Sequence, residues 1–361
     1  MTARRTFLKS LLAASVIPTL SWADAGSPSY LAAAKIADGR FSLFGLDAMG
    51  QIRFSIPLPT RGHAAAAHPT RPEAVAFARR PGTYAIVLDC ISGDEIARMT
   101  TPEGRHFYGH GVFSQDGNTL FTTENHIETG EGRIGVWQVS AEYRRVGEFS
   151  SNGVGPHEIL RLTGSDILVV ANGGIRTHPE TGRAKLNLET MRPNLSYLTT
   201  AGAVLDVVEL DETLHQNSIR HIALGPDGLV GMAMQWQGNV VEKPPLLALH
   251  QMGETLRLLA APMMQHRWLK GYAGSIAFSN DGQLVGITSP RGGVAQFFDT
   301  TSDGFIQQID QPDICGLAPH LNGFLATDGS GNTLEISVGG ATLLTTNANM
   351  AWDNHLVPIK T

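Results

Sequence analysis

A unit that repeats along the chain is the feature that most constrains its fold. Each unit has a short apolar strand, a polar turn that often contains Asp-Gly, a second apolar strand, a loop and two further strands. The units begin at intervals of 47, 47, 64, 54, 40 and 40 residues, at His63, His110, His157, His221, Ser275, Cys315 and His355. A four-stranded propeller blade needs about 40–50 residues, so the repeat predicts a β-propeller.

The two ends of the chain supply the parts of one further blade. Only one strand fits between His355 and Thr361, whereas residues 29–58 hold three strand-like segments that precede the first complete unit. We therefore expect an all-β, seven-bladed propeller of four-stranded blades, whose last blade is closed by both termini. Residues 26–361 would form this one domain, with an insertion at about 174–196 in blade 3. A tandem of two smaller β domains is the alternative, although no linker divides the chain.

The N-terminal residues 1–25 have the layout of a secretory signal. Arg4 and Arg5 precede a weakly apolar stretch, and small residues follow at Ala23-Asp24-Ala25, which is typical of the twin-arginine type. This predicts export to the periplasm; the alternative is a cytosolic chain with a basic N-terminus. The apolar stretch is too short to span a membrane, so no membrane insertion is expected. A net charge of −6 without a basic run argues against nucleic acid as a partner.

Histidine begins five of the seven units, at positions 63, 110, 157, 221 and 355. The first strand of a propeller blade lines the central channel, so these five side chains should meet at one mouth of that channel. Neutral imidazoles bind zinc, copper, iron and nickel, and several imidazoles packed together would repel one another once protonated. We therefore predict a shared metal site. The alternative is that each histidine hydrogen-bonds within its own blade, as the Gly-His dipeptide of WD-type propellers does.

Four further residues are second-rank candidates for this site. The end of a second strand should lie at the same face, which makes Glu124 an additional oxygen ligand or a carboxylate that orients a histidine. His126 and His178 lie in loops expected at that face, and Cys315 takes the place of histidine in blade 6. Strand alternation would turn Glu158 away from the channel unless the strand begins later. No catalytic residue is identified, because nucleophile-elbow, phosphate-loop and haem-attachment motifs do not occur.

Several stretches resemble an uncharacterised bacterial family of twin-arginine-exported seven-bladed propellers. The resemblance rests on "GHGVFSQDGNTLFTTEN", "GVGPHEI", "NSIRHIA" and, most specifically, the string from Ala171 to Leu188. Members tend to be encoded beside imelysin-like iron-uptake proteins and dihaem peroxidase-like proteins. The resemblance thus implies periplasmic metal handling, with iron favoured and other iron-uptake or redox proteins as partners. A more distant similarity is to the propeller of nitrous oxide reductase, where channel-mouth histidines hold copper.

Three functions remain open from the sequence. The first is a metal-binding protein that takes iron, or copper by the softness of imidazole, for uptake or handling. The second is an enzyme that uses the same metal for redox or hydrolytic chemistry. The third is a metal-free interaction scaffold.

Overall fold

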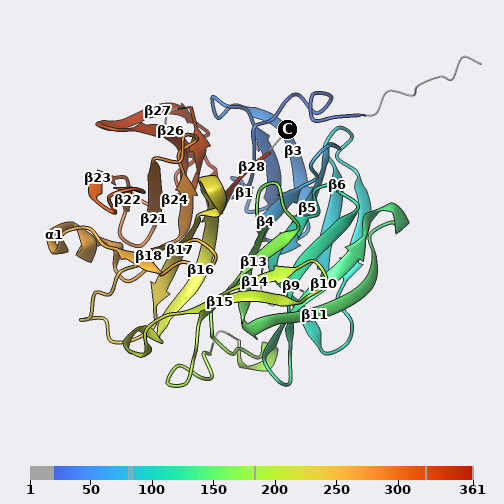
Figure 1. The fold of residues 1–361 in the computed structure, drawn as a ribbon. Helices are drawn as coiled ribbons and strands as arrows, with labels where there is room; N and C mark the ends of the chain where they lie inside the picture. Colours follow the sequence, from blue (N-terminus) through green and yellow to red (C-terminus); the bar gives the residue numbers. More distant parts are fainter. Residues whose placement is uncertain (1–19, 80–81, 83, 183, 322, 360–361) are drawn as a thin grey trace, which may run out of the picture.

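The computed structural model describes residues 20–359 except 80, 81, 83, 183 and 322. These residues form seven four-stranded antiparallel sheets arranged in a ring, which confirms the predicted propeller (Figure 1). The predicted signal segment lies mostly outside the described residues. Its last part is described: Trp22 is buried, and its indole Nε1 donates to the carbonyl of His68 at 2.9 Å.

The blades follow the chain in order, each from its innermost strand outward. Blade 1 comprises β4 (Gly62–Ala67), β5 (Glu73–Ala78), β6 (Tyr84–Asp89) and β7 (Glu95–Thr100). Blade 2 comprises β8 (Arg105–Phe113), β9 (Thr119–His126), β10 (Glu131–Gln138) and β11 (Arg144–Val154). Blade 3 comprises β12 (Pro156–Arg161), β13 (Ile167–Asn172), β14 (Asn194–Thr199) and β15 (Val204–Glu209). Blade 4 comprises β16 (Asn217–Leu224), β17 (Val230–Trp236), β18 (Leu247–His250) and β19 (Arg257–Leu259). Blade 5 comprises β20 (Ser275–Phe278), β21 (Leu284–Ser289), β22 (Val294–Asp299) and β23 (Phe305–Asp310). Blade 6 comprises β24 (Ile314–His320), β25 (Gly323–Asp328), β26 (Asn332–Ser337) and β27 (Gly340–Thr346).

Blade 7 joins the two ends of the chain. Its innermost strand is β28 (Ala351–Pro358), and β1 (Tyr30–Lys35), β2 (Phe41–Leu46) and β3 (Ile52–Leu58) complete it. Strands β1 and β28 pair antiparallel, with Tyr30 opposite Pro358. This pairing closes the ring as the sequence predicted, and backbone hydrogen bonds between the termini hold the circle together.

Helical structure in residues 20–359, as far as they are described, is limited to short turns. They are α1 (Met263–His266), η1 (Val139–Ala141), η2 (Pro179–Thr181), η3 (Glu212–Leu214), η4 (Pro226–Gly228) and η5 (Arg267–Leu269). Within the described part of the chain, none of these is long and apolar enough to cross a bilayer.

The core lies between neighbouring blades rather than in a single centre. Blades 1 and 2 share one cluster that includes Phe77, Phe107 and Trp137, all with at most 3% of their surface exposed. Successive side chains of a strand point to opposite faces of its sheet, so each blade buries apolar residues against both neighbours. Burial of this kind fixes the angle between blades and hence the position of every innermost strand.

Irregular pairing marks the point where most innermost strands reach the channel. The register between the innermost and second strands shifts in six of the seven blades. In five of these the irregular segment contains the residue at the channel: His63, His110, His157, Cys315 or His355. In blade 4 the extra residue is Arg220, and His221 follows it. Only β20, which begins at Ser275, pairs regularly with its neighbour. A β-bulge bends the strand and re-aims the side chain at the bulge, so these irregularities direct the histidines.

Candidate metal centre

The five predicted histidines come together at the centre of the ring. They project from β4, β8, β12, β16 and β28, and their ring centroids lie 4.7 to 5.9 Å apart in eight pairs. His110, His221 and His355 are at least 92% buried, and His63 and His157 are half-buried. We call these five residues the histidine cluster. The sequence-based prediction that circular symmetry gathers them is confirmed by this geometry.

Two overlapping triads of the cluster could each hold a metal ion. One is His63, His110 and His355, and the other is His110, His157 and His221; in each triad the potential ligand nitrogens all lie within 4.8 Å of one another. His110 belongs to both triads. Nitrogens about 2.0–2.1 Å from a common ion lie roughly 3–4 Å apart, so small side-chain movements would close either triad around one ion.

Several ring nitrogens in the cluster are buried without a hydrogen-bond partner among the described residues. They are His110 Nε2, His157 Nδ1 and His355 Nε2. An unpaired buried polar atom costs about 1–3 kcal/mol, so three in one place need a reason. A bound cation would supply the missing partner for the unpaired nitrogens of the triad that holds it.

One glycine permits the close approach of two members. Gly109 has φ +99°, and a Cβ built on it would lie 2.4 Å from His63 Cδ2. Both the backbone conformation and the contact exclude a side chain at this position. Gly109 therefore allows the neighbouring His110 to lie beside His63, with 4.9 Å between ring centroids.

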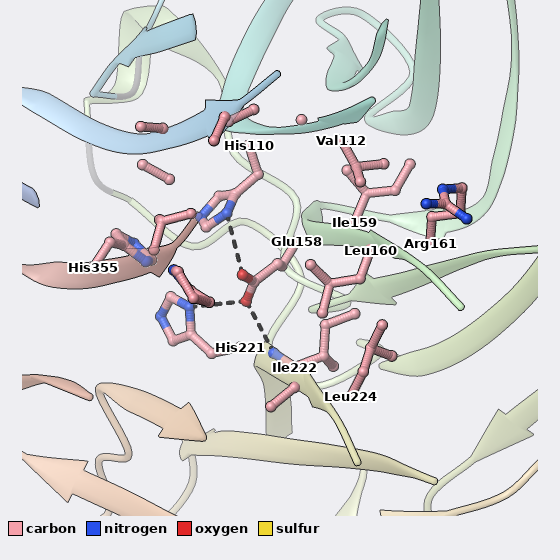
Figure 2. A pocket seen from close by; sticks show the side chains of 18 of the residues that line it. His110, Val112, Glu158, Ile159, Leu160, Arg161, His221, Ile222, Leu224 and His355 are labelled. Carbon is pink, nitrogen blue, oxygen red and sulfur yellow. Dashed lines mark hydrogen bonds and ion pairs between the residues drawn. The ribbon is translucent and has the colours of Figure 1, made fainter. Parts of the chain in front are cut away.

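Among the described residues, Glu158 is the one carboxylate that contacts the cluster, although strand alternation had predicted that it faces away from the channel. Its Oε1 lies 3.6 Å from His110 Nδ1 and its Oε2 lies 3.2 Å from His221 Nδ1, as Figure 2 shows. The backbone N–H of Ile222 donates to the same Oε2 at 2.9 Å. The alternation expected of a regular strand is interrupted because β12 has its extra residue at His157, which lets Glu158 also face the channel. No sequence signal marks this bulge beyond Pro156.

This carboxylate can orient the imidazoles. By accepting from Nδ1–H of His221 it favours the tautomer of that residue that leaves Nε2 as the lone-pair donor, and its negative charge also faces Nδ1 of His110. A metal-bound histidine commonly uses its second nitrogen in this way. Burial alone would raise the pKa of Glu158, but charge interactions and hydrogen bonds with His110 and His221 lower that pKa below its usual range.

The electrostatics of the cluster keep most of its imidazoles neutral. Burial, followed by repulsion from neighbouring histidines, lowers the pKa of His63, His157 and His355 well below the usual value, and burial also lowers the pKa of His221. Arg79 and Arg220 add to this effect. Neutral imidazole is the form that binds metals, so the site is prepared for a cation near pH 7.

Blades 5 and 6 do not complete the ring of ligands. Ser275 begins the regular strand β20 and offers a hydroxyl where five other blades offer an imidazole. The thiol of Cys315 instead faces backbone carbonyls, with Sγ 3.4 Å from Thr327 O and 3.4 Å from Asp353 O. Burial raises the pKa of this thiol to about 12, so it stays protonated and is a poor ligand as it stands. The structure thus places Cys315 in the packing between blades 6 and 7.

The other second-rank candidates also lie apart from the two triads. Glu124 is fully buried, but its Oε1 accepts from Arg145 Nη1 at 2.6 Å and from Thr122 at 2.9 Å. His126 Nδ1 accepts from the backbone of Thr129, and His178 Nδ1 accepts from the backbone of Glu180. Each of these side chains has a local structural contact that the repeat pattern alone could not show.

The loop of blade 3 connects the loops of its neighbours. It runs from 173 to 193, because β14 begins at Asn194. Arg176 Nη2 donates to the carbonyl of Glu128 in blade 2, and Lys185 contacts Gln237 in blade 4. These contacts fix the loop across three blades.

A cavity of about 330 Å³ occupies the channel on one side of the cluster. His110, His221, His355 and Glu158 line its inner end, and all seven innermost strands contribute to its walls. Figure 2 shows apolar side chains such as Val112, Ile159 and Leu224 around this space. The site therefore combines a polar end with a largely apolar chamber.

Comparison with known proteins gives a family and a fold. The family described as "Protein of unknown function (DUF1513)" matches residues 56–359. No curated protein sequence matches the chain. A chain from the solved structure of hydrazine synthase from Kuenenia stuttgartiensis is similar, with a TM-score of 0.60 and 13% identity over 94% of this chain and 100% of that chain. At this identity the likeness concerns the fold alone.

Proposed function

The chain belongs to the DUF1513 family of proteins of unknown function, and we propose that it is a metal-binding β-propeller. In this proposal the histidine cluster holds an iron ion, or alternatively copper, and the protein acts in metal uptake or handling. The observation that carries the proposal is the convergence of five mostly buried imidazoles with three unpaired ring nitrogens. The carboxylate of Glu158 supports it, because it is hydrogen-bonded to one potential ligand, His221, and its charge faces a second, His110.

The choice of metal follows from chemistry and from the sequence. Imidazole suits copper, iron, zinc and nickel, and copper would bind most tightly by the Irving–Williams order. The family resemblance favours iron, and the twin-arginine layout of residues 1–25 supports a periplasmic location. Other iron-uptake or redox proteins of the periplasm are the proposed partners, and nucleic acid and membrane insertion are not part of the proposal.

Elemental analysis of protein purified from its native compartment tests the proposal. We expect about one equivalent of a transition metal, and a metal-edge anomalous map with its peak among the five imidazoles. A triple variant with His110, His157 and His221 changed to alanine should purify without metal. The proposal fails if the triple variant keeps the metal content of the unaltered protein, or if neither protein holds metal after incubation with Fe²⁺ or Cu²⁺.

A metal-dependent enzyme is the second candidate, and the cavity favours it. A chamber of about 330 Å³ ends at the cluster, which would give a small molecule access to a bound ion. Turnover assays of the metal-loaded protein with peroxide or with a reducible metal ion distinguish this candidate from simple metal handling. A folded protein without metal or turnover would instead favour the interaction scaffold.

A further inference from the structure

We propose that the channel cavity is a binding site for a small, mostly apolar organic molecule that carries one polar donor group at its end. The polar group would lie against His110, His221, His355 and Glu158, and the apolar body would fill the rest of the channel. This inference extends the proposed function. It rests on that function only for the ligand's polar group, which a bound metal would coordinate. The cavity's affinity for an apolar body can be tested separately.

The size of the cavity limits the ligand. A volume of about 330 Å³ lies at the lower end of the range of about 300–1,000 Å³ that small-molecule pockets occupy. Residues from all seven innermost strands surround it, so its shape is set by the closed ring. A rigid chamber of this size suits a compact molecule, such as one with a single aromatic ring, rather than a chain polymer.

The walls determine the chemistry of the ligand's body. Between the inner end and the rim, the lining is mainly alanine, valine, isoleucine, leucine and phenylalanine, with Ala65, Val112, Ala223 and Phe278 as examples from four blades. Among the described lining residues, Glu158 and Arg161 alone carry a permanent charge, and Arg161 already donates to the carbonyl of Ser165 at 2.8 Å. A charged body would be desolvated without a partner along these walls, so an uncharged one is favoured.

The inner end determines the chemistry of the ligand's head. Nε2 of His110 and Nε2 of His355 are buried and unpaired there, and both residues line the cavity. In the metal-loaded protein a lone pair on the ligand's polar group would be directed toward the cluster. Without metal, a polar hydrogen on the same group would pair with one of these nitrogens after a small movement of its ring, because both nitrogens are buried. His63 and His157 do not line the cavity, so they would be free to hold an ion without contact with the ligand's body.

The opposite end of the cavity gives access to the ligand. Pro69, Ser114 and Thr163 line it, and they belong to the turns that follow innermost strands in blades 1 to 3. Thr163 is exposed to solvent. A molecule can therefore enter along the channel axis without disturbing the histidine cluster.

The test compares imidazole with 4-phenylimidazole as probes of the full-length protein. The two have the same donor, and only the second has an apolar body for the chamber. With the cobalt(II)-loaded protein, visible absorption should show that 4-phenylimidazole binds at least about tenfold more tightly than imidazole, because the phenyl ring is buried. Equal affinities within about twofold would overturn the inference.

Two variants that fill the cavity sharpen this test. Ala65→Leu in β4 and Ala223→Leu in β16 add bulk to different walls, and Ala203→Leu on an exposed outer turn is the matched control. Either filling variant that folds should lose the advantage of 4-phenylimidazole while it keeps cobalt binding, and the control should behave like the unaltered protein. Retention of the full advantage in a folded filling variant would contradict the inference.

The metal-free protein separates failure of this inference from failure of the proposed function. Ligand-observed saturation-transfer NMR should detect 4-phenylimidazole on the apoprotein, with a weaker signal in the filling variants. If cobalt does not bind but this signal appears and responds to the variants, the proposed metal function fails and the cavity assignment stands. If cobalt binds but 4-phenylimidazole has no advantage and the apoprotein gives no signal, only the cavity assignment fails.

Discussion

Blades 7 and 1 to 4 differ from blades 5 and 6 at one equivalent position. The first five are consecutive around the ring and place histidine where the innermost strand reaches the channel, whereas the last two place Ser275 and Cys315 there. Strand β20 has no bulge at Ser275, and the Cys315 thiol faces backbone carbonyls between blades. The fold is therefore nearly symmetric, but its candidate site is one-sided: blades 7 and 1 to 4 supply the potential ligands, and blades 5 and 6 supply none.

The largest expected effect concerns the histidine shared by both triads. His110→Ala removes a potential ligand from each triad, whereas His157→Ala removes one from a single triad and is the matched control. We expect metal affinity to fall at least about 100-fold in His110→Ala and less in His157→Ala, because an open triad can still hold an ion. Competition with a chromophoric chelator measures both constants. Equal losses in the two variants would contradict this expectation, because the bound ion would then depend no more on His110 than on His157.

A smaller loss is expected when the orienting carboxylate is changed. Glu158→Gln keeps the shape of the side chain but removes the charge that faces His110 and His221. Loss of such a partner typically weakens metal binding about 10- to 100-fold. Glu124→Gln is the matched control in blade 2, because Glu124 contacts Arg145 rather than the cluster. Chelator competition should show a change for Glu158→Gln alone; a similar loss in the control would contradict the assignment.

Acid should destabilise the metal-free protein, because most of the histidine cluster is buried in its neutral form. The pKa values of His63, His157, His221 and His355 are lowered by burial in the folded state, so the unfolded chain binds more protons below about pH 6.5. Stability is therefore full above that pH and falls as the pH decreases toward the folded-state values. We expect the free energy of unfolding to drop by about 1 kcal/mol or more between pH 7 and pH 5.

Urea unfolding in the presence of a chelator measures this dependence. Replacement of His355 by glutamine, which does not titrate, should make the curve of stability against pH less steep. A stability that stays constant from pH 7 to pH 5 would mean that the imidazoles are not held neutral in the folded protein.

The smallest effect on metal binding is expected for Cys315 in blade 6. Cys315→Ser should leave metal affinity within about twofold, because the protonated thiol points to Thr327 and Asp353 rather than to the cluster. The same change should lower the free energy of unfolding by about 1 kcal/mol, since a hydroxyl replaces a buried thiol. Chelator competition and urea unfolding measure the two quantities. A large loss of metal binding would place Cys315 among the ligands after all.

Much of the fold could be predicted from the repeat because its physical causes are local. Short strands rich in branched residues, Asp-Gly turns and regular spacing identify a blade, and the surplus strands at residues 29–58 complete β28. The histidine cluster followed from the same repeat. Residues equivalent in a closed ring meet at its axis whatever their distance along the chain, so five unit starts were enough to identify five potential ligands.

The roles of single side chains could not be predicted in the same way. Alternation along an ideal strand predicted that Glu158 points away from the channel, but the bulge at His157 directs its side chain toward the channel. Its position at the end of a second strand suggested Glu124 as a member of the central site. In the structure Glu124 instead pairs with Arg145 of β11, within blade 2. The contacts of Cys315 with carbonyls of blades 6 and 7 likewise depend on how two blades pack.

The amino-acid sequence by itself determined the number of blades, the closure of the ring and the identity of the five central imidazoles, because each depends on periodicity. Only the tertiary structure decided which carboxylate reaches the imidazoles, which nitrogens are left unpaired, and that an apolar chamber ends at the cluster. These features depend on one-residue shifts in strand register and on contacts between blades. Such shifts change the direction of a side chain while leaving the repeat pattern intact.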